Sequence, residues 1–135
     1  MYYTSHSPEE TENIAALFAK KLKGGDIVAL FGDLGAGKTC FVRGMASGLG
    51  LDPTDVSSPT FALMNLYENR LAHFDMYRIG AGEPVDSTGF FDFADIIRVV
   101  EWAENITEYL TKETIKITIN KTDENTREIE IEDRE

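Results

Sequence analysis

Cysteine, positive charge and long apolar runs are all scarce in this 135-residue sequence. The single cysteine, Cys40, excludes an internal disulfide and fits a reducing compartment. No apolar stretch reaches the length of a membrane span, and Met1-Tyr2-Tyr3-Thr4 lacks the basic-then-apolar pattern of a signal peptide. We therefore expect a cytoplasmic protein that does not contact a membrane.

The shortage of positive charge also limits the partners. Thirteen Lys and Arg residues stand against 24 Asp and Glu residues, which gives a net charge of −11. An acidic surface repels the phosphates of RNA and DNA, so we expect any nucleic acid to be held by another protein. A hydrophobic content of 42% is that of an ordinary globular protein, and the length predicts a single domain over residues 1–135.

Glycine is concentrated in the most informative stretch, Gly32-Asp33-Leu34-Gly35-Ala36-Gly37-Lys38-Thr39. It reads G-x-x-x-x-G-K-T, the Walker A phosphate loop. An apolar β-type run, 26–31, precedes it, and a helical pattern that ends at Gly48 or Gly50 follows it. Strand, glycine loop and helix are the context that this motif requires, so the sequence predicts nucleoside triphosphate binding.

The loop and the first turn of the helix are the expected phosphate contacts, because their backbone N–H groups and the helix dipole favour anions. The predicted contacts are Asp33, Leu34, Gly35, Ala36, Gly37, Lys38, Thr39 and Cys40. Lys38 is expected to reach the β- and γ-phosphates, and the Thr39 hydroxyl to bind Mg²⁺. Cys40 is interpreted as a small helix residue; the alternative is a thiol with its pKa lowered by the helix N-terminus.

Patterns elsewhere predict the remaining elements. The N-terminal part is expected to form an edge strand over Tyr2–Ser5 and a helix from Ser7 and Pro8 past Leu22 to Gly24-Gly25. The middle of the chain is expected to form a hairpin of 61–67 and 71–75 that turns at Glu68–Arg70, and then short helices within 76–95. A buried parallel strand over 95–100, a short helix to about Leu110 and a terminal hairpin of 115–119 and 129–131 complete the prediction. Together they indicate an α/β, P-loop NTPase-like fold: a central, mostly parallel sheet flanked by helices, with an antiparallel C-terminal hairpin at an edge.

A phosphate loop also needs an acid for Mg²⁺ and a group that positions water. Asp75 and Glu101 each close an apolar run, and ligands bind at the carboxyl ends of parallel strands. Glu101 follows the more apolar run and is the better Walker B candidate. The predicted catalytic residues are therefore Lys38, Asp75 and Glu101, and which acid positions the water stays open. Thr60 is a candidate sensor of the γ-phosphate or simply the first residue of a strand.

Four motifs occur in the order seen in the TsaE (YjeE) family. They are Gly32–Thr39, Ser58-Pro59-Thr60, His73-Phe74-Asp75-Met76-Tyr77-Arg78 and Val100-Glu101-Trp102. The chain therefore resembles this family of small bacterial ATPases of the tRNA threonylcarbamoyladenosine pathway, from about residue 5 to residue 105.

The resemblance implies a Mg²⁺-dependent ATPase that binds ATP and ADP. It implies action with TsaB and TsaD, whose complex the ATP cycle resets between rounds, so tRNA is met only through them. By position, Thr39 and Glu101 fall on Mg²⁺ and Asp75 on a residue needed for hydrolysis. Trp102 and the Tyr77-Arg78 pair resemble packing or partner-facing residues, and core packing is preferred for Trp102. We expect weak turnover by the chain alone.

Two other functions compete with this interpretation. Asn120-Lys121-Thr122-Asp123 spells N-K-x-D, the guanine-reading motif of GTPases, although Asn and Asp also favour the hairpin turn expected there. A small-molecule P-loop kinase would need an arginine-rich lid, and Arg70, Arg78 and Arg98 form no cluster in the sequence. His6 and His73 lack the spacing of a zinc site.

Overall fold

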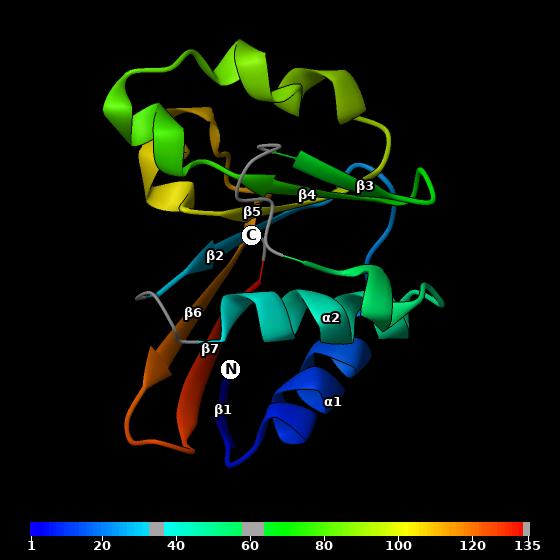
Figure 1. The fold of residues 1–135 in the computed structure, drawn as a ribbon, viewed down its shortest axis with the longest axis vertical. Helices are drawn as coiled ribbons and strands as arrows, with labels where there is room; N and C mark the ends of the chain where they lie inside the picture. Colours follow the sequence, from blue (N-terminus) through cyan, green and yellow to red (C-terminus); the bar gives the residue numbers. More distant parts are fainter. Residues whose placement is uncertain (33–36, 58–63, 134–135) are drawn as a thin grey trace.

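Seven strands form one sheet in the computed structural model, which describes residues 1–32, 37–57 and 64–133 (Figure 1). The strands are β1 (Tyr2–Ser5), β2 (Ile27–Phe31), β3 (Met64–Tyr67), β4 (Leu71–Asp75), β5 (Ile97–Glu101), β6 (Ile115–Lys121) and β7 (Arg127–Glu132). Their order across the sheet is β1-β7-β6-β2-β5-β4-β3. The four central strands, β6, β2, β5 and β4, run parallel, and the outer pairs are antiparallel. The predicted mostly parallel sheet is confirmed.

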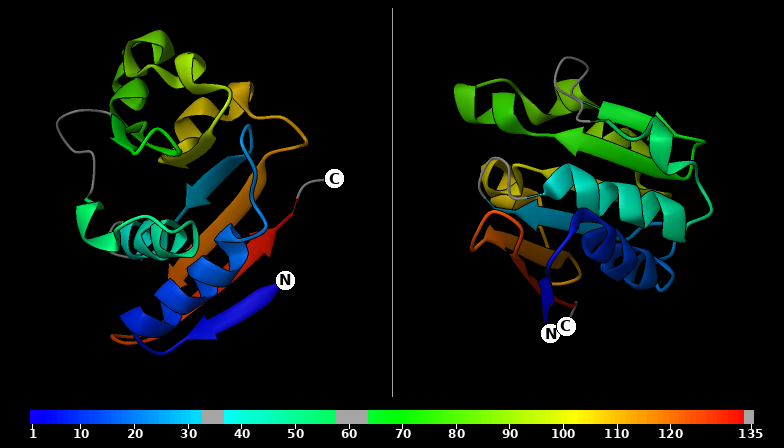
Figure 2. Two further views of the ribbon diagram at one scale, coloured as in Figure 1. Left: turned by 90° about the vertical axis from the view of Figure 1, so that its right-hand side faces the viewer. Right: turned by 60° about the horizontal axis from the view of Figure 1, so that its bottom comes forward.

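Two α-helices cover one face of the sheet. They are α1 (Pro8–Ala19) and α2 (Lys38–Gly48), which lie together on the same side in Figures 1 and 2. They approach closely because Gly44 has no side chain: a Cβ there would lie 2.6 Å from the Cβ of Ala15. Their apolar side chains and those of the alternate strand positions, such as Val28 and Leu30, form one buried cluster. Period-two alternation in the strands decides which residues face these helices.

Short 3₁₀ helices cover the other face. They are η2 (Tyr77–Ala81), η3 (Val85–Thr88), η4 (Phe90–Phe93) and η5 (Ala103–Tyr109), and they follow the carboxyl ends of β4 and β5. Phe74 of β4 and Phe90 of η4 meet edge to face, with ring centroids 5.6 Å apart, in a second buried cluster. A further turn, η1 (Pro53–Asp55), follows α2. The short helices predicted within 76–95 are confirmed.

Several local predictions hold and two are wrong. Ser7 caps α1 by accepting a hydrogen bond from the backbone N–H of Glu10 at 3.1 Å. The helix, however, ends at Ala19 and not beyond Leu22, because the backbone N–H groups of Lys21 and Leu22 bond three residues back and tighten the chain into turns. The terminal hairpin is also not at an edge, since β1 pairs with β7 outside it.

Other local features follow the sequence. The turn predicted at Glu68–Arg70 is confirmed: three residues connect the paired Tyr67 and Leu71, and Glu68 and Asn69 both have positive φ. The part of the predicted strand before Met64 lies outside the described residues. None of the helices within the described ranges is long and apolar enough to cross a membrane.

Candidate functional site

The candidate phosphate loop starts where β2 ends and finishes at the first turn of α2. Gly32 has a φ of +141°, and a Cβ at this position would collide with the backbone carbonyl oxygen of Ile119 on β6. Only glycine therefore fits at the start of the loop. Gly37 has a φ of +102° and its carbonyl accepts from the N–H of Phe41 at 3.0 Å. Outside the described residues lie the predicted contacts Asp33, Leu34, Gly35 and Ala36, and the candidate sensor Thr60.

Lys38 is the first residue of α2, and its ammonium turns back toward the start of the loop. It is 5% exposed, and its Nζ donates to the Gly32 carbonyl at 2.9 Å. The same Nζ lies 4.6 Å from the centroid of the Trp102 ring, a cation–π distance. Trp102 also packs against Tyr77 edge to face, with ring centroids 5.1 Å apart. Core packing, the role preferred for Trp102 from the sequence, thus accounts for its contact with Tyr77 but not for its contact with the Lys38 ammonium.

Asp75 and Glu101 are brought together by strand register. They end the neighbouring parallel strands β4 and β5 and are paired directly across the ladder. Glu101 is 5% exposed and Asp75 is half-buried. Burial raises the pKa of Asp75, and the nearby Glu101 charge adds to this, whereas the hydrogen bond from the Tyr77 N–H and the charges of His73 and Lys38 lower it. Three predicted catalytic residues, Lys38, Asp75 and Glu101, therefore share one end of the sheet.

His73 is a site residue that the sequence interpretation missed. It is fully buried, and its Nε2 lies 2.5 Å from Oε2 of Glu101. The available signal was the strand period: Asn65, Tyr67, His73 and Asp75 occupy alternate positions of the β3–β4 hairpin. Positions two apart share a face, so polar side chains gather on the face that α2 covers.

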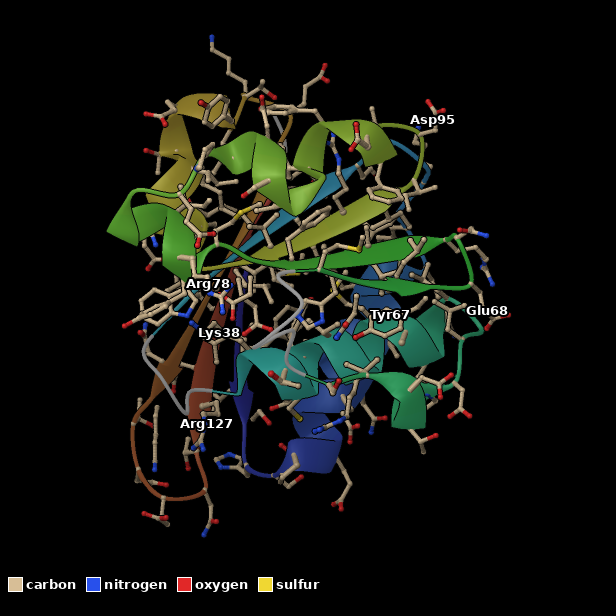
Figure 3. All side chains as sticks on the ribbon, turned by 45° about the horizontal axis from the view of Figure 1, so that its top comes forward. Lys38, Tyr67, Glu68, Arg78, Asp95 and Arg127 are labelled. Carbon is tan, nitrogen blue, oxygen red and sulfur yellow. The ribbon has the colours of Figure 1, made fainter. Side chains whose placement is uncertain are left out.

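Arg127 is the second missed residue. It begins β7, and its Nε lies 3.9 Å from the place that a Cβ on Gly37 would occupy. Its guanidinium also donates to the carbonyls of the hairpin turn, at 3.1 Å for Thr126 and 3.2 Å for Asp123. Figure 3 labels Arg127 and Lys38, which extend from different elements. Nothing local to Arg127 in the sequence indicates this placement, which depends on β6 pairing with β2.

The remaining predicted contacts lie in the first turn of α2. Thr39 and Cys40 are its second and third residues and are half-buried. The Cys40 thiol donates to the Pro8 carbonyl at 3.4 Å. Burial raises the pKa of Cys40, and the charge of Glu12 raises it further. The alternative of a lowered thiol pKa is therefore wrong, because the loss of water around the sulfur outweighs the favourable charges of Arg43 and Arg127.

The N-K-x-D segment forms part of the terminal hairpin. Asn120 and Lys121 pair with Glu128 and Arg127 in the β6–β7 ladder. The Asp123 carboxylate accepts from the backbone N–H groups of Asn125 and Thr126, both at 2.9 Å. The hydrogen bond from Asn125 is the main reason that the pKa of Asp123 is lowered. The carboxylate that would read guanine is thus already engaged in closing the turn.

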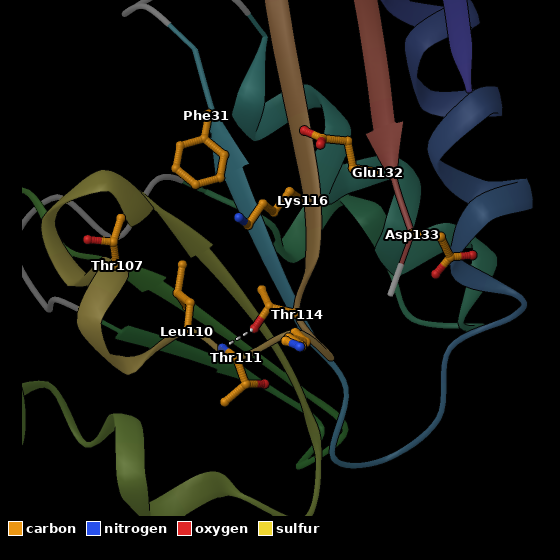
Figure 4. A pocket seen from close by; sticks show the side chains of 9 residues that line it. Phe31, Thr107, Leu110, Thr111, Thr114, Lys116, Glu132 and Asp133 are labelled. Atoms are coloured by element: carbon orange, nitrogen blue, oxygen red, sulfur yellow. Dashed lines mark hydrogen bonds between the residues drawn. The ribbon is translucent and has the colours of Figure 1, made fainter. Parts of the chain in front are cut away.

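A separate hollow of 350 Å³ lies between β2, β6 and the segment after η5 (Figure 4). Lys116 and Glu132 line it, together with Phe31 and Leu110. The Thr111 N–H donates to the Thr114 hydroxyl at 3.2 Å at its floor. None of the predicted site residues that the structure describes lines this hollow, so we assign it no part in the site.

The chain is similar to known proteins over nearly its whole length. Residues 5–129 match the family model described as threonylcarbamoyl adenosine biosynthesis protein TsaE. The TsaE protein of Rickettsia prowazekii is 40% identical over 129 residues, covering 93% of this chain and 90% of the relative. The TsaE protein of Bacillus subtilis is 41% identical over 127 residues, covering 91% and 79%. The crystal structure of Bacillus subtilis YdiB superposes with a TM-score of 0.75 at 35% identity, covering 96% of this chain and 82% of that one.

Proposed function

Because this chain belongs to the TsaE family of tRNA threonylcarbamoyladenosine biosynthesis proteins, we propose that it binds and hydrolyses ATP with Mg²⁺ in that pathway. The observation that carries the proposal is the placement of Lys38. It begins the helix that follows a glycine loop, and it shares one end of the sheet with the carboxylates of Asp75 and Glu101. One cation for phosphate and two acids for metal and water are the parts that phosphoryl transfer needs.

Phosphate binding is assigned to the loop and to Lys38. The glycines free backbone N–H groups to point at phosphate oxygens, and α2 adds its N-terminal donors. Lys38 supplies a positive charge that the Gly32 carbonyl and the face of Trp102 hold in place. Arg127 adds a second cation beside Gly37.

Magnesium is assigned to Thr39 and Glu101. A hydroxyl and a carboxylate are hard oxygen ligands of the kind that Mg²⁺ prefers, and phosphate oxygens and water would supply its other ligands. Within the ranges that the structure covers, no three His, Cys, Asp or Glu side chains cluster closely enough to form a cage of their own. When bound, the ion neutralises charge on the β- and γ-phosphates.

Asp75 is assigned to the attacking water. It is half-buried and its Oδ1 accepts from the N–H of Tyr77 at 2.9 Å, which holds the carboxylate in one orientation at the strand end. Glu101 is more deeply buried and tied to His73, so the two acids have different surroundings. A raised pKa brings Asp75 closer to the range in which a carboxyl group can take up a proton from water.

We propose that the partners are TsaB–TsaD-like proteins, which hold the tRNA. The net charge of −11 supports this, because an acidic protein attracts RNA poorly by itself. Turnover by the isolated chain is expected to be slow, with partners raising it.

The test is equilibrium binding of Mg-ADP and Mg-GDP to the whole chain, followed through the fluorescence of Trp102, its single tryptophan. We expect a clear preference for ADP, and loss of binding or of ATP hydrolysis in Lys38→Ala. Preference for GDP would revive the guanine reading of Asn120–Asp123. A Lys38→Ala protein with native affinity and turnover would refute the assignment of the site.

A further inference from the structure

A chain of polar contacts runs from the candidate metal ligand across the β4–β3 hairpin; it is buried from Glu101 through His73 to Tyr67 and reaches the surface at Ser57. Nε2 of His73 lies 2.5 Å from Glu101, and Nδ1 lies 3.2 Å from the Tyr67 hydroxyl. The Tyr67 hydroxyl in turn lies 3.4 Å from the Ser57 N–H, and Nδ2 of Asn65 donates to the Ser57 carbonyl at 3.1 Å. His73 is fully buried, and Glu101 and Tyr67 are 5% and 8% exposed.

The donors in this chain can all point one way. An ionised carboxylate only accepts, so Nε2 of His73 must carry the hydrogen that faces Glu101. In a neutral imidazole Nδ1 is then an acceptor. The Tyr67 O–H lies 3.2 Å from Nδ1 and 3.3 Å from the Ser57 carbonyl, and we assign its hydrogen to Nδ1 because the Asn65 amide already donates to that carbonyl. The Tyr67 oxygen accepts from the Ser57 N–H, and Asn65 satisfies the Ser57 carbonyl. Hydrogen bonds aligned in this way reinforce one another in a buried environment.

We propose that His73 and Tyr67 are positioning residues that hold the Glu101 carboxylate for the metal and tie it to the backbone at Ser57. This proposal rests on the proposed function, because it takes Glu101 as a ligand of Mg²⁺. A glutamate has three rotatable side-chain bonds, and a buried imidazole that fixes one carboxylate oxygen restricts the positions open to the other. Partners of this kind typically change metal affinity about 10–100-fold when removed.

The position of Ser57 gives the chain of contacts a second end. Ser57 directly precedes Ser58-Pro59-Thr60 in the sequence, which includes the candidate γ-phosphate sensor. Asn65 and Tyr67 lie on β3, which follows the same segment. His73 and Tyr67 therefore connect Glu101 to the residue that precedes this motif.

The variants are chosen to separate positioning from packing. His73→Gln keeps an N–H in reach of Glu101 but loses the nitrogen that faces Tyr67. His73→Leu loses both contacts and keeps an apolar side chain in the core. Tyr67→Phe removes only the hydroxyl, and Tyr3→Phe on β1 is the matched control, since its hydroxyl contacts Met1 at the far edge of the sheet.

The measurement is the affinity for ADP without metal and the apparent Mg²⁺ affinity at fixed ADP, both from Trp102 fluorescence. We expect His73→Leu to weaken Mg²⁺ about 10-fold or more, with metal-free ADP affinity within about 2-fold of native. His73→Gln should recover most of the loss, Tyr67→Phe should lose about 3-fold, and Tyr3→Phe should match the native protein. Two outcomes would overturn the proposal. One is an equal loss of ADP affinity with and without Mg²⁺, and the other is native Mg²⁺ affinity in all three variants, Tyr67→Phe, His73→Gln and His73→Leu.

A second readout uses the protein without nucleotide. The chain has only two histidines, so ¹⁵N-labelled histidine gives a spectrum in which His73 is readily assigned by comparison with His73→Gln. We expect the hydrogen on Nε2. A tautomer protonated only at Nδ1 leaves no hydrogen facing Glu101 and would refute the proposed direction of the contacts.

These results are separable from the wider proposal. If Lys38→Ala binds and hydrolyses normally, the proposed function itself is wrong. If Lys38→Ala is inactive while the His73 and Tyr67 variants bind Mg²⁺ as the native protein does, only the positioning role is wrong.

Discussion

Lys38 lies over the ring of Trp102, with its Nζ 4.6 Å from the ring centroid, although the two residues come from different strand-to-helix connections. Trp102 directly follows Glu101 and has a φ of +59°, a conformation that non-glycine residues adopt at a cost. Such a conformation persists only when the surroundings enforce it. Here it turns the indole under the ammonium that we assign to phosphate binding.

The strain at Trp102 predicts an unusual order of stability. Trp102→Ala loses the ring contacts with Tyr77 and Lys38 and keeps the unfavourable backbone, whereas Trp102→Gly loses the same contacts and relieves it. We expect Trp102→Gly to be about 1 kcal/mol more stable than Trp102→Ala, by urea unfolding. At an ordinary helical position an alanine variant is more stable than a glycine variant. If Trp102→Ala proves more stable than Trp102→Gly, the backbone at residue 102 carries no strain.

Asp75 predicts a pH dependence of stability. Its pKa is raised in the folded chain, mainly by burial, so the folded state binds more protons than the unfolded state between the unfolded pKa of roughly 4 and the higher folded value. Stability attributable to this group therefore falls as the pH rises through that window. Asp75→Asn, whose amide oxygen can still accept from the Tyr77 N–H, should be more stable than the native chain at neutral pH.

The advantage of Asp75→Asn should shrink in acid, where the native carboxyl is protonated, and the variant should hydrolyse ATP poorly at every pH. Thermal unfolding from pH 3 to pH 8 checks the first point. An advantage that is constant over this range would contradict the assignment to ionisation.

Gly32 predicts a steric requirement at the start of the loop. Gly32→Ala adds a Cβ that collides with the Ile119 carbonyl on β6 and also takes a φ of +141°. We expect a loss of roughly 2–4 kcal/mol in the free energy of unfolding, together with weaker nucleotide binding. Gly82→Ala is the matched control, because Gly82 has a φ of +100° and no atom of the described residues lies within 4 Å of an added Cβ. It should lose only about 1 kcal/mol, and equal losses in both variants would show that the collision is relieved without cost.

Arg127 predicts a contribution to nucleotide affinity from the terminal hairpin. Its guanidinium lies beside Gly37, where a charge-assisted hydrogen bond to phosphate can form. Arg127→Ala should weaken ADP binding about 10-fold, while Arg43→Ala, on an exposed position of α2, should leave it unchanged. Isothermal titration calorimetry measures both. Because Arg127 also donates to the turn carbonyls, Arg127→Lys is included as a variant that retains the charge. Equal ADP affinity in the native chain, Arg127→Ala and Arg127→Lys would exclude the contact with phosphate.

The sequence alone determined the features that depend on neighbours along the chain. The strand and the helix on either side of the glycine loop, the Ser7 cap of α1 and the turn at Glu68–Arg70 each follow from local backbone preferences and the period of apolar residues. The order of motifs also identified the family. These are properties that a short segment carries with it wherever it lies in the fold.

Tertiary structure alone decided which distant residues meet. The register of β4 against β5 pairs Asp75 with Glu101, and the burial of that strand end brings His73 onto the same carboxylate. The pairing of β6 with β2 carries Arg127 to Gly37, 90 positions earlier in the sequence. Strand order and register are set by the packing of whole faces and not by any one segment. Local patterns therefore place Asp75 and Glu101 at strand ends and His73 on a polar face, but they do not predict which residues pair.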